Sequence, residues 1–324
     1  MTVNNRRGLV PTLLVVLIVF ATGPVAGQDA PRTPWGAPDL QGIWDFKTAT
    51  PLERPEDRGE QAFLTEEEAA GIEQEAVDRN VRLWDAAPRR TEAGGNVGGY
   101  NNFWLDFGTS VIDSRRTSLI VDPPNGRIPA LTDEGQQRAD ERQAYREAHP
   151  ADSYLDRSAF DRCILGFNTG PPMTPGFYNQ NMQLFQTPGH VVVLNEMVHD
   201  ARIIPLDGSP RPGIESWTGE SRGVWEGDTL VVETTHFSDK HGYRGSTKDR
   251  HLVERFTRVD AGTLLYEFTI TDPATWTAPW TAQVPMRSTE LPLFEYACHE
   301  GNYAMPNILG GERRAERMQE SGQN

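Results

Sequence analysis

The side chains best suited to chemistry in this sequence are three histidines at the ends of expected β-strands. Two of them directly precede a carboxylate, His199 with Asp200 and His299 with Glu300, and the third is His236. A neutral imidazole beside a carboxylate can transfer protons near pH 7, and imidazoles also bind zinc and other divalent metals. Because strand ends converge on one rim of a barrel, the three could meet there. In the alternative reading, each histidine hydrogen-bonds a loop of its own.

A dense polar cluster follows the last expected strand, residues 293–298. It contains His299, Glu300, Asn302 and Tyr303. A disulfide between the chain's two cysteines, Cys163 and Cys298, would fix this cluster against the Gly- and Pro-rich run at 170–176. An active or binding site needs rigid placement of this kind. The tied end of a barrel has the same features, so both readings stay open.

Together these residues define one predicted site. Its expected catalytic groups are His236, His299, Glu300 and Tyr303, and its expected ligand contacts are Arg222, His199, Trp225 and Asn302. Arg222 could hold a carboxylate or another anion by a two-pronged contact, or it could pair with a surface acid. No metal or cofactor is assigned, because the sequence contains none of the motifs His-x-His, His-Glu-x-x-His, Gly-x-Gly-x-x-Gly, P-loop or Gly-x-Ser-x-Gly.

The elements that must position these residues are β-hairpins, and two hairpins repeat. Residues 223–235 align with 257–269, so that Glu233 falls on Glu267. In the second copy, apolar and mostly polar residues alternate, which predicts one buried face formed by Leu264, Tyr266, Phe268 and Ile270. The repeat then places Leu230, Val232, Thr234 and His236 inward as well. Glu233 and Glu267 would face outward, which makes them surface residues rather than a catalytic pair.

From residue 181 onward the sequence is dense in β-forming residues. Strands are expected at 182–187, 190–198, 201–206, 221–226, 228–236, 251–259, 263–271, 280–287 and 293–298, with short strands at 42–46 and 117–121. The predicted fold class is therefore mostly β: an antiparallel meander that closes into a lipocalin-like barrel or a sandwich.

Two surface helices and an extended N-terminal arm complete the expected architecture. Thr65 opens a capping box for a helix to about Leu83, and Thr132 caps a second helix that runs to about Ala148. The Pro- and Gly-rich residues 28–63 should form the arm, with Trp35 and Trp44 on the domain surface. The expected division is 1–27 signal peptide, 28–105 arm and surface helix, and 106–324 β-barrel-like domain, with 28–324 as one folded unit.

The first 27 residues have the features of a secretory signal, with Arg6 and Arg7 ahead of an apolar run and small residues at 25–27. Cleavage would leave no stable membrane span; the alternative is a retained N-terminal anchor. Without the two arginines the formal net charge changes from −15 to −17, which disfavours nucleic-acid binding. In a periplasmic or secreted protein, Cys163 and Cys298 could form a disulfide, whereas the alternative is two buried thiols.

Three segments resemble a family of secreted bacterial proteins of unassigned function. They are Pro34-Trp-Gly-Ala-Pro-Asp-Leu-Gln-Gly42, Ser221-Arg-Gly-Val-Trp-Glu-Gly-Asp-Thr-Leu-Val-Val232 and Glu295-Tyr-Ala-Cys-His-Glu-Gly-Asn-Tyr303. The resemblance covers most of the chain that follows the signal. It implies export and one shared architecture, and it carries no activity.

Two functions from different classes fit these features. The first is an exported β-barrel that binds a small, largely apolar molecule, as indicated by the meander and the aromatic residues. The second is an exported lyase, isomerase or hydrolase that uses histidine and carboxylate groups, with or without a metal. A structural or accessory protein of the cell envelope is a third reading. The expected partner is a small molecule, and neither a nucleic acid nor a membrane.

Overall fold

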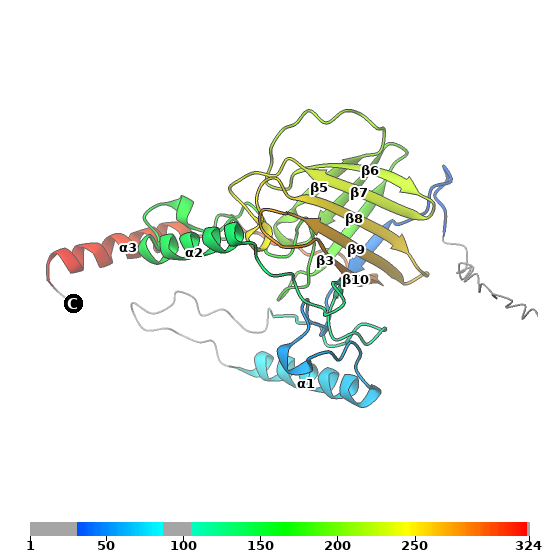
Figure 1. The fold of residues 1–324 in the computed structure, drawn as a ribbon, viewed down its shortest axis with the longest axis horizontal. Helices are drawn as coiled ribbons and strands as arrows, with labels where there is room; N and C mark the ends of the chain where they lie inside the picture. The colour runs from blue at the N-terminus through cyan, green and yellow to red at the C-terminus, as the bar shows by residue number, and fades with distance from the viewer. Residues whose placement is uncertain (1–30, 87–104, 323–324) are drawn as a thin grey trace, which may run out of the picture.

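The computed structural model describes residues 31–86 and 105–322, and it is dominated by one ten-stranded antiparallel sheet (Figure 1). The predicted signal peptide at 1–27 lies outside the described residues. The strands are β1 (Gly42–Asp45), β2 (Ile120–Asp122), β3 (Asn181–Gln186), β4 (His190–Asn195), β5 (Ala201–Pro205), β6 (Glu220–Glu226), β7 (Thr229–Thr235), β8 (His251–Arg258), β9 (Thr263–Thr271) and β10 (Trp280–Thr289). Their order is β5-β4-β3-β1-β10-β9-β8-β7-β6, and β2 pairs with β10.

The N-terminal segment is an integral part of this sheet. β1 pairs with β3 on one side and β10 on the other, so it joins the two meanders β3–β5 and β6–β10. Trp44 in this strand is only 1% exposed and belongs to the core, so its predicted place on the domain surface is wrong. The physical reason is that a strand paired on both sides has one face turned to the apolar interior. Trp35, by contrast, is 41% exposed, as expected.

The mostly β meander is confirmed, but the sheet stops short of closing into a barrel. β5 and β6 are its two edges, and among the described residues no backbone hydrogen bond joins them. Side chains from β5 and the residue after it nevertheless reach the backbone of β6. A Cβ added to Gly223 of β6 would lie 2.6 Å from Leu206 Cδ2 and 3.0 Å from Ile204 Cγ2. Glycine at this position therefore allows the two edges to approach; the line between them is called the seam below.

The interior of the curved sheet is filled with side chains. Leu264, Tyr266, Phe268 and Ile270 have no exposed surface, which confirms the face predicted from the hairpin repeat. The rings of Phe256 and Tyr266 are 5.0 Å apart between centroids. Glu267 points the other way and accepts a hydrogen bond from Gln283 at 2.7 Å. Burying each large apolar side chain of this kind stabilises the fold by about 1.5–3 kcal/mol.

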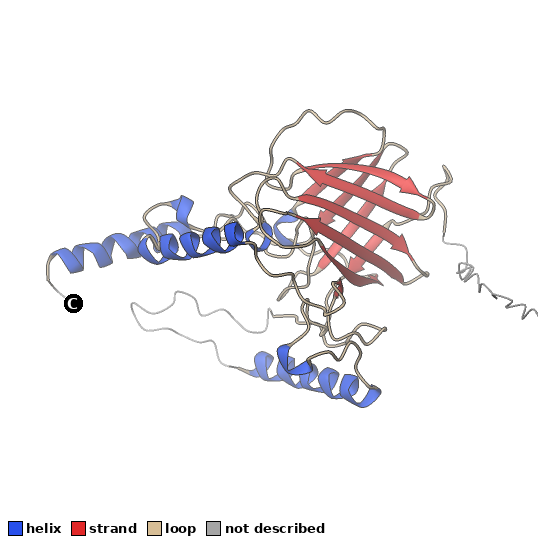
Figure 2. Cartoon of the chain, viewed as in Figure 1, coloured by secondary structure: helices blue, strands red, loops and turns tan. Residues whose placement is uncertain are grey.

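In the part of the chain that the structure describes, three α-helices lie outside the sheet (Figure 2). They are α1 (Glu66–Asp85), α2 (Asp133–Ala148) and α3 (Ala304–Glu320). The capping box of Thr65 and Glu68 and the cap by Thr132 are both present, as predicted. None of the helices among residues 31–86 and 105–322 is long and apolar enough to cross a membrane.

Helix α3 was not expected from the sequence, because Pro306 and Gly310-Gly311 disfavour a helix. Pro306 is its third residue, where the missing N–H has no intrahelical acceptor in any case. The two glycines each weaken a helix by about 1 kcal/mol relative to alanine, and α3 tolerates both. Its Arg313 donates a hydrogen bond at 2.9 Å to the carbonyl of Asp152, just beyond the end of α2.

Two expected strands differ from the structure. The strand predicted at 190–198 ends at Asn195, because Val198 and His199 have φ of +61° and +51° and form a tight turn into β5. The strand predicted at 293–298 is irregular. Its alternating sequence is misleading, since the N–H groups of Phe294 and Tyr296 donate to side chains and not to a neighbouring strand.

Candidate functional site

An aromatic cluster lies at the end of the sheet where β3 and β5 begin. It consists of five rings from the loop at 157–180 and the C-terminal segment: Phe160, Phe167, Phe177, Tyr178 and Tyr296. The Phe167 ring is 5.2 Å from Phe160 and 5.3 Å from both Phe177 and Tyr178. Tyr178 and Tyr296 stack at 6.0 Å. Burial, followed by the bond to Tyr178, raises the pKa of Tyr296, so this phenol stays neutral at pH 7.

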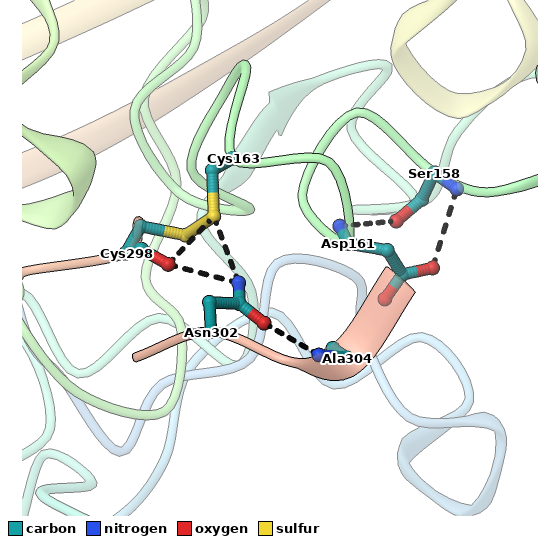
Figure 3. The surroundings of a disulfide bond; sticks show 6 residues. All are labelled: Ser158, Asp161, Cys163, Cys298, Asn302 and Ala304. Carbon is teal, nitrogen blue, oxygen red and sulfur yellow. Dashed lines mark hydrogen bonds between the residues drawn. A yellow bond between two sulfur atoms is a disulfide. The ribbon is translucent and has the colours of Figure 1, made fainter. Parts of the chain in front are cut away.

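The predicted disulfide is present and ties the two parts of the aromatic cluster together. The Sγ atoms of Cys163 and Cys298 are 2.02 Å apart, and the bond joins the 157–180 loop to the C-terminal segment (Figure 3). Asn302 donates from Nδ2 to the carbonyl of Cys298 at 2.8 Å and accepts from the N–H of Ala304 at 2.9 Å. Asn302 therefore supports the disulfide and the start of α3, and its expected contact with a ligand stays a prediction.

His199 is the predicted site residue that lies beside this cluster. Its Nε2 accepts a hydrogen bond of 3.3 Å from the N–H of Tyr296. In this bond Nε2 is the acceptor, which places the proton of the neutral tautomer on Nδ1. The neighbouring Glu196 is 1% exposed and accepts from the N–H of Phe294 at 2.9 Å. These two side chains hold the C-terminal segment against the start of β5.

The remaining C-terminal candidates project into solvent. His299 and Glu300 are exposed, and Tyr303 is 70% exposed. Their side chains make no hydrogen bond or ion pair with another described residue. Of the predicted site residues His199, Arg222, Trp225 and His236, only His199 has a hydrogen bond with the segment that carries them among the described residues.

His236 and Arg222 belong to a different region, on the outside of β6 and β7. β7 ends at Thr235, and His236 has φ of +55°, so the next residue, Phe237, takes the buried position with no exposed surface. The side chain of His236 is 39% exposed and its Nδ1 lies 3.7 Å from Glu220. The prediction that His236 faces inward is wrong, because the left-handed residue breaks the alternation of the strand.

Arg222 and Trp225 have structural roles in β6. The guanidinium of Arg222 donates to the carbonyls of Ser209, Pro210 and Ser221 and to the carboxylate of Glu220 at 2.9 Å. Through these bonds it holds the 206–219 connection against the sheet, and its expected contact with a ligand anion stays a prediction. Trp225 is partly buried and packs against the core.

A second imidazole–carboxylate pair stands on the same outer surface. His251 Nε2 lies 2.6 Å from Glu233, which also accepts from Arg211 at 2.6 Å. The hydrogen bond with His251 and the contact with Arg211 lower the pKa of Glu233. Glu233 is 49% exposed, so its predicted outward direction is confirmed.

A charged network that was not predicted from the sequence lies inside the sheet. Arg202 of β5 forms two hydrogen bonds with Glu254 of β8, at 2.5 and 2.9 Å, and both residues are buried. Tyr266 donates to the same carboxylate at 2.8 Å, and burial raises the pKa of this phenol well above its ordinary value. The signal was available in β8, where Glu254 stands between Leu252 and Phe256 on the apolar face.

The described residues contain no group of three or more His, Cys, Asp or Glu side chains placed to hold a metal ion. Two surface pockets, of about 550 and 310 Å³, lie at α2 and at α1, and neither is lined by residues of the sheet. No protein-family model matches the chain, and no curated protein or solved structure is similar to it.

Proposed function

We propose that the protein is exported and binds a small, largely apolar molecule at the aromatic cluster. The observation that carries this proposal is the gathering of five rings from two distant chain segments that a disulfide joins. Phe177 of this cluster is 52% exposed, so its ring is accessible to a ligand. Contacts between aromatic rings contribute about 0.5–1.5 kcal/mol each beyond the area that they bury.

The cluster offers a better site than the interior of the sheet. Inside the sheet, Trp44, Phe256, Tyr266 and Trp280 have at most 1% exposed surface and fill the space that a lipocalin-like ligand would need. At the cluster, apolar rings lie next to His199, whose Nδ1–H makes no hydrogen bond with a described residue. Apolar walls with a few polar groups at the edge are typical of small-molecule sites.

Export is supported by the disulfide. Disulfides persist in oxidising compartments and are rare in the cytosol of mesophiles. The bond between Cys163 and Cys298, together with the expected signal at 1–27, favours the periplasm or the extracellular space.

Binding of N-phenyl-1-naphthylamine, a neutral aromatic probe, tests the proposal. Changing Phe177 to Ala removes an exposed ring and should weaken binding about tenfold, which corresponds to about 1.4 kcal/mol. Changing Phe185 to Ala is the matched control, because this residue of β3 is 42% exposed and lies outside the cluster. Equal affinities of the Phe177→Ala variant and the unchanged protein would rule out the cluster as the site.

One observation favours the alternative that the protein is an enzyme, namely the two imidazole–carboxylate pairs on the outside of β6–β8. His251 and Glu233 are in direct contact, and His236 is near Glu220. A lyase, isomerase or hydrolase could use such a pair for proton transfer, which contributes about 10²–10⁴-fold to a rate. The rates at which the protein and its His251→Gln variant hydrolyse p-nitrophenyl esters distinguish an enzyme from a binding protein. A hundredfold loss in the variant favours the enzyme, and equal rates exclude His251 as its base.

A further inference from the structure

A basic groove lies between α2 and the turn at Tyr243–Gly245, away from the aromatic cluster. Its volume is about 550 Å³. Three arginines line it: Arg142 and Arg146 from α2, and Arg244 from the turn. The other lining residues are Ala139, Gln143, Glu147 and Gly245.

The arginines of the groove have few acidic partners. Among the described residues, no carboxylate lies within 4.0 Å of Arg142 or Arg146, and Arg244 reaches only Glu53, at 3.9 Å. One turn earlier on α2, Arg138 pairs with Glu134 at 2.6 Å. Acidic residues outnumber basic ones in this chain by 46 to 31, so partners for surface arginines are abundant in general. The scarcity of acidic partners in this groove is therefore not expected from the acidic composition of the chain.

The charges within the groove do not cancel. Its single carboxylate, Glu147, accepts a hydrogen bond from Gln143 at 2.9 Å. Three guanidinium groups against one carboxylate leave a formal excess of two positive charges. Burial and the neighbouring Arg146 and Arg138 lower the pKa of Arg142, which reflects like charges held close together.

One wall of the groove is anchored to the core. Tyr243 stacks on Trp280 with 6.2 Å between ring centroids, and Trp280 is fully buried. Arg244 follows with φ of +49°. A Cβ at Gly245 would lie 3.9 Å from Nη1 of Arg142, so the turn and the helix approach closely here. The core-anchored turn thus places Arg244 opposite the arginines of α2.

We propose that this basic groove binds a small anion that carries two phosphate groups, free or as part of a lipid headgroup. Guanidinium groups bind phosphate oxygens by paired hydrogen bonds, and one arginine from each wall can bind each end of a diphosphate. The site is separate from the aromatic cluster, so this proposal goes beyond the proposed function and does not depend on it.

Isothermal titration with pyrophosphate at low ionic strength tests the groove. Each guanidinium supplies charge-assisted hydrogen bonds to a phosphate, so Arg142→Gln, Arg146→Gln and Arg244→Gln should each weaken binding at least about tenfold. Arg317→Gln on α3 is the matched control, because it removes the same charge from an exposed helix outside the groove. It should change the affinity less than about twofold.

A second arm uses phosphatidylcholine vesicles that contain phosphatidic acid or a lipid diphosphate. Vesicle binding that the groove variants abolish assigns the phosphate to a lipid, whereas binding of pyrophosphate alone assigns it to a soluble ligand. The proposal is overturned if pyrophosphate does not bind the unchanged protein, or if Arg317→Gln weakens binding as much as the groove variants do. Thermal melts of the variants establish that the fold is intact.

Discussion

At the scale of single residues, the ion pair inside the sheet is the buried charged contact between β5 and β8. Arg202 and Glu254 are both buried, and Tyr266 supplies a further hydrogen bond to the carboxylate. Removing two ions from water is unfavourable, and their mutual attraction offsets this only while both partners are present. The intact pair therefore adds little to the free energy of unfolding, whereas removal of one partner lowers that free energy strongly.

The first prediction follows from this asymmetry. Arg202→Met should lower the free energy of unfolding by about 3–5 kcal/mol, because it leaves the Glu254 carboxylate buried without a counter-charge. The double variant Arg202→Met/Glu254→Leu should recover most of the loss. Urea unfolding followed by tryptophan fluorescence measures both. A single variant as stable as the unchanged protein would show that Glu254 is protonated or hydrated instead.

The second prediction concerns Asp200, whose pKa burial raises despite the opposing attraction of Arg202. The folded state then binds the proton more tightly than the unfolded state, where the pKa is about 3.9. The stability linked to protonated Asp200 is present at low pH and lost as the pH rises through the folded pKa. Asp200→Asn should therefore raise the melting temperature at pH 7, and this gain should shrink below about pH 4.

Asp207→Asn is the control for this experiment, because it should act in the opposite direction. The N–H of Ser209 donates to Asp207 and lowers the pKa of the carboxyl. Its contribution is present above the unfolded pKa and lost on acidification. Asp207→Asn should therefore destabilise the protein slightly at pH 7 and have no effect in acid. Melting temperatures are measured for both variants across this pH range. If both variants shift the melting temperature in the same direction, the opposite pKa shifts assigned to Asp200 and Asp207 are contradicted.

At this scale, periodicity predicted which residues are buried but not which partners they meet. The alternation in β9 identified Leu264, Tyr266, Phe268 and Ile270 correctly, because a strand with one buried face imposes a period of two. The alternation in β8 places Glu254 on the apolar face, but it could not identify the partner, because Arg202 comes from another hairpin. His236 failed for a different reason: a positive φ at one residue transferred the buried position to Phe237.

At the scale of elements, local signals predicted hairpins and helix caps, whereas side-chain contacts over long sequence separations determined the rest. Thr65 and Thr132 cap α1 and α2 as expected, because a cap depends only on residues three positions apart. Residues 293–298 have an alternating sequence but form no strand. Their N–H groups bond to Glu196 and His199, residues about a hundred positions earlier, and no local pattern could have indicated this.

The third prediction concerns the link between the 157–180 loop and the C-terminal segment. Cys163 and Cys298 are separated by 135 residues. In the chain-entropy model, closing a loop of this length stabilises a protein by about 5 kcal/mol. The variant Cys163→Ser/Cys298→Ser should lose up to this amount in urea unfolding. Reduced unchanged protein is its control and should show the same loss; if it stays as stable as the oxidised form, the disulfide contributes nothing.

At the scale of the whole molecule, the seam between β5 and β6 distinguishes this sheet from a closed barrel. The fourth prediction tests how tightly the seam is packed. Gly223→Val should destabilise the protein by about 1–3 kcal/mol, because the new side chain meets Leu206 and Ile204. Adding Leu206→Ala to this variant should relieve part of the strain. Gly189→Ala is the control, because a Cβ there meets nothing within 4 Å.

Thermal unfolding of these variants provides the measurement. If Gly223→Val and Gly189→Ala had equal melting temperatures, the two edges would be farther apart in solution than the structure shows. The sequence predicted the meander that leads to these edges, because it is built from consecutive hairpins. It could not predict where the sheet stops, since that depends on the accumulated twist and curvature of all the strands.

The seam also makes the mechanical resistance of the sheet depend on the direction of an applied force. All other neighbouring strands are joined by rows of backbone hydrogen bonds, which carry a load applied across the sheet. Between β5 and β6 this load is carried by side-chain packing alone. The buried Arg202–Glu254 pair adds a charged contact between β5 and β8. The sheet is therefore weaker along the seam than between its hydrogen-bonded strands. A force that pulls β5 away from β6 should separate these two strands first.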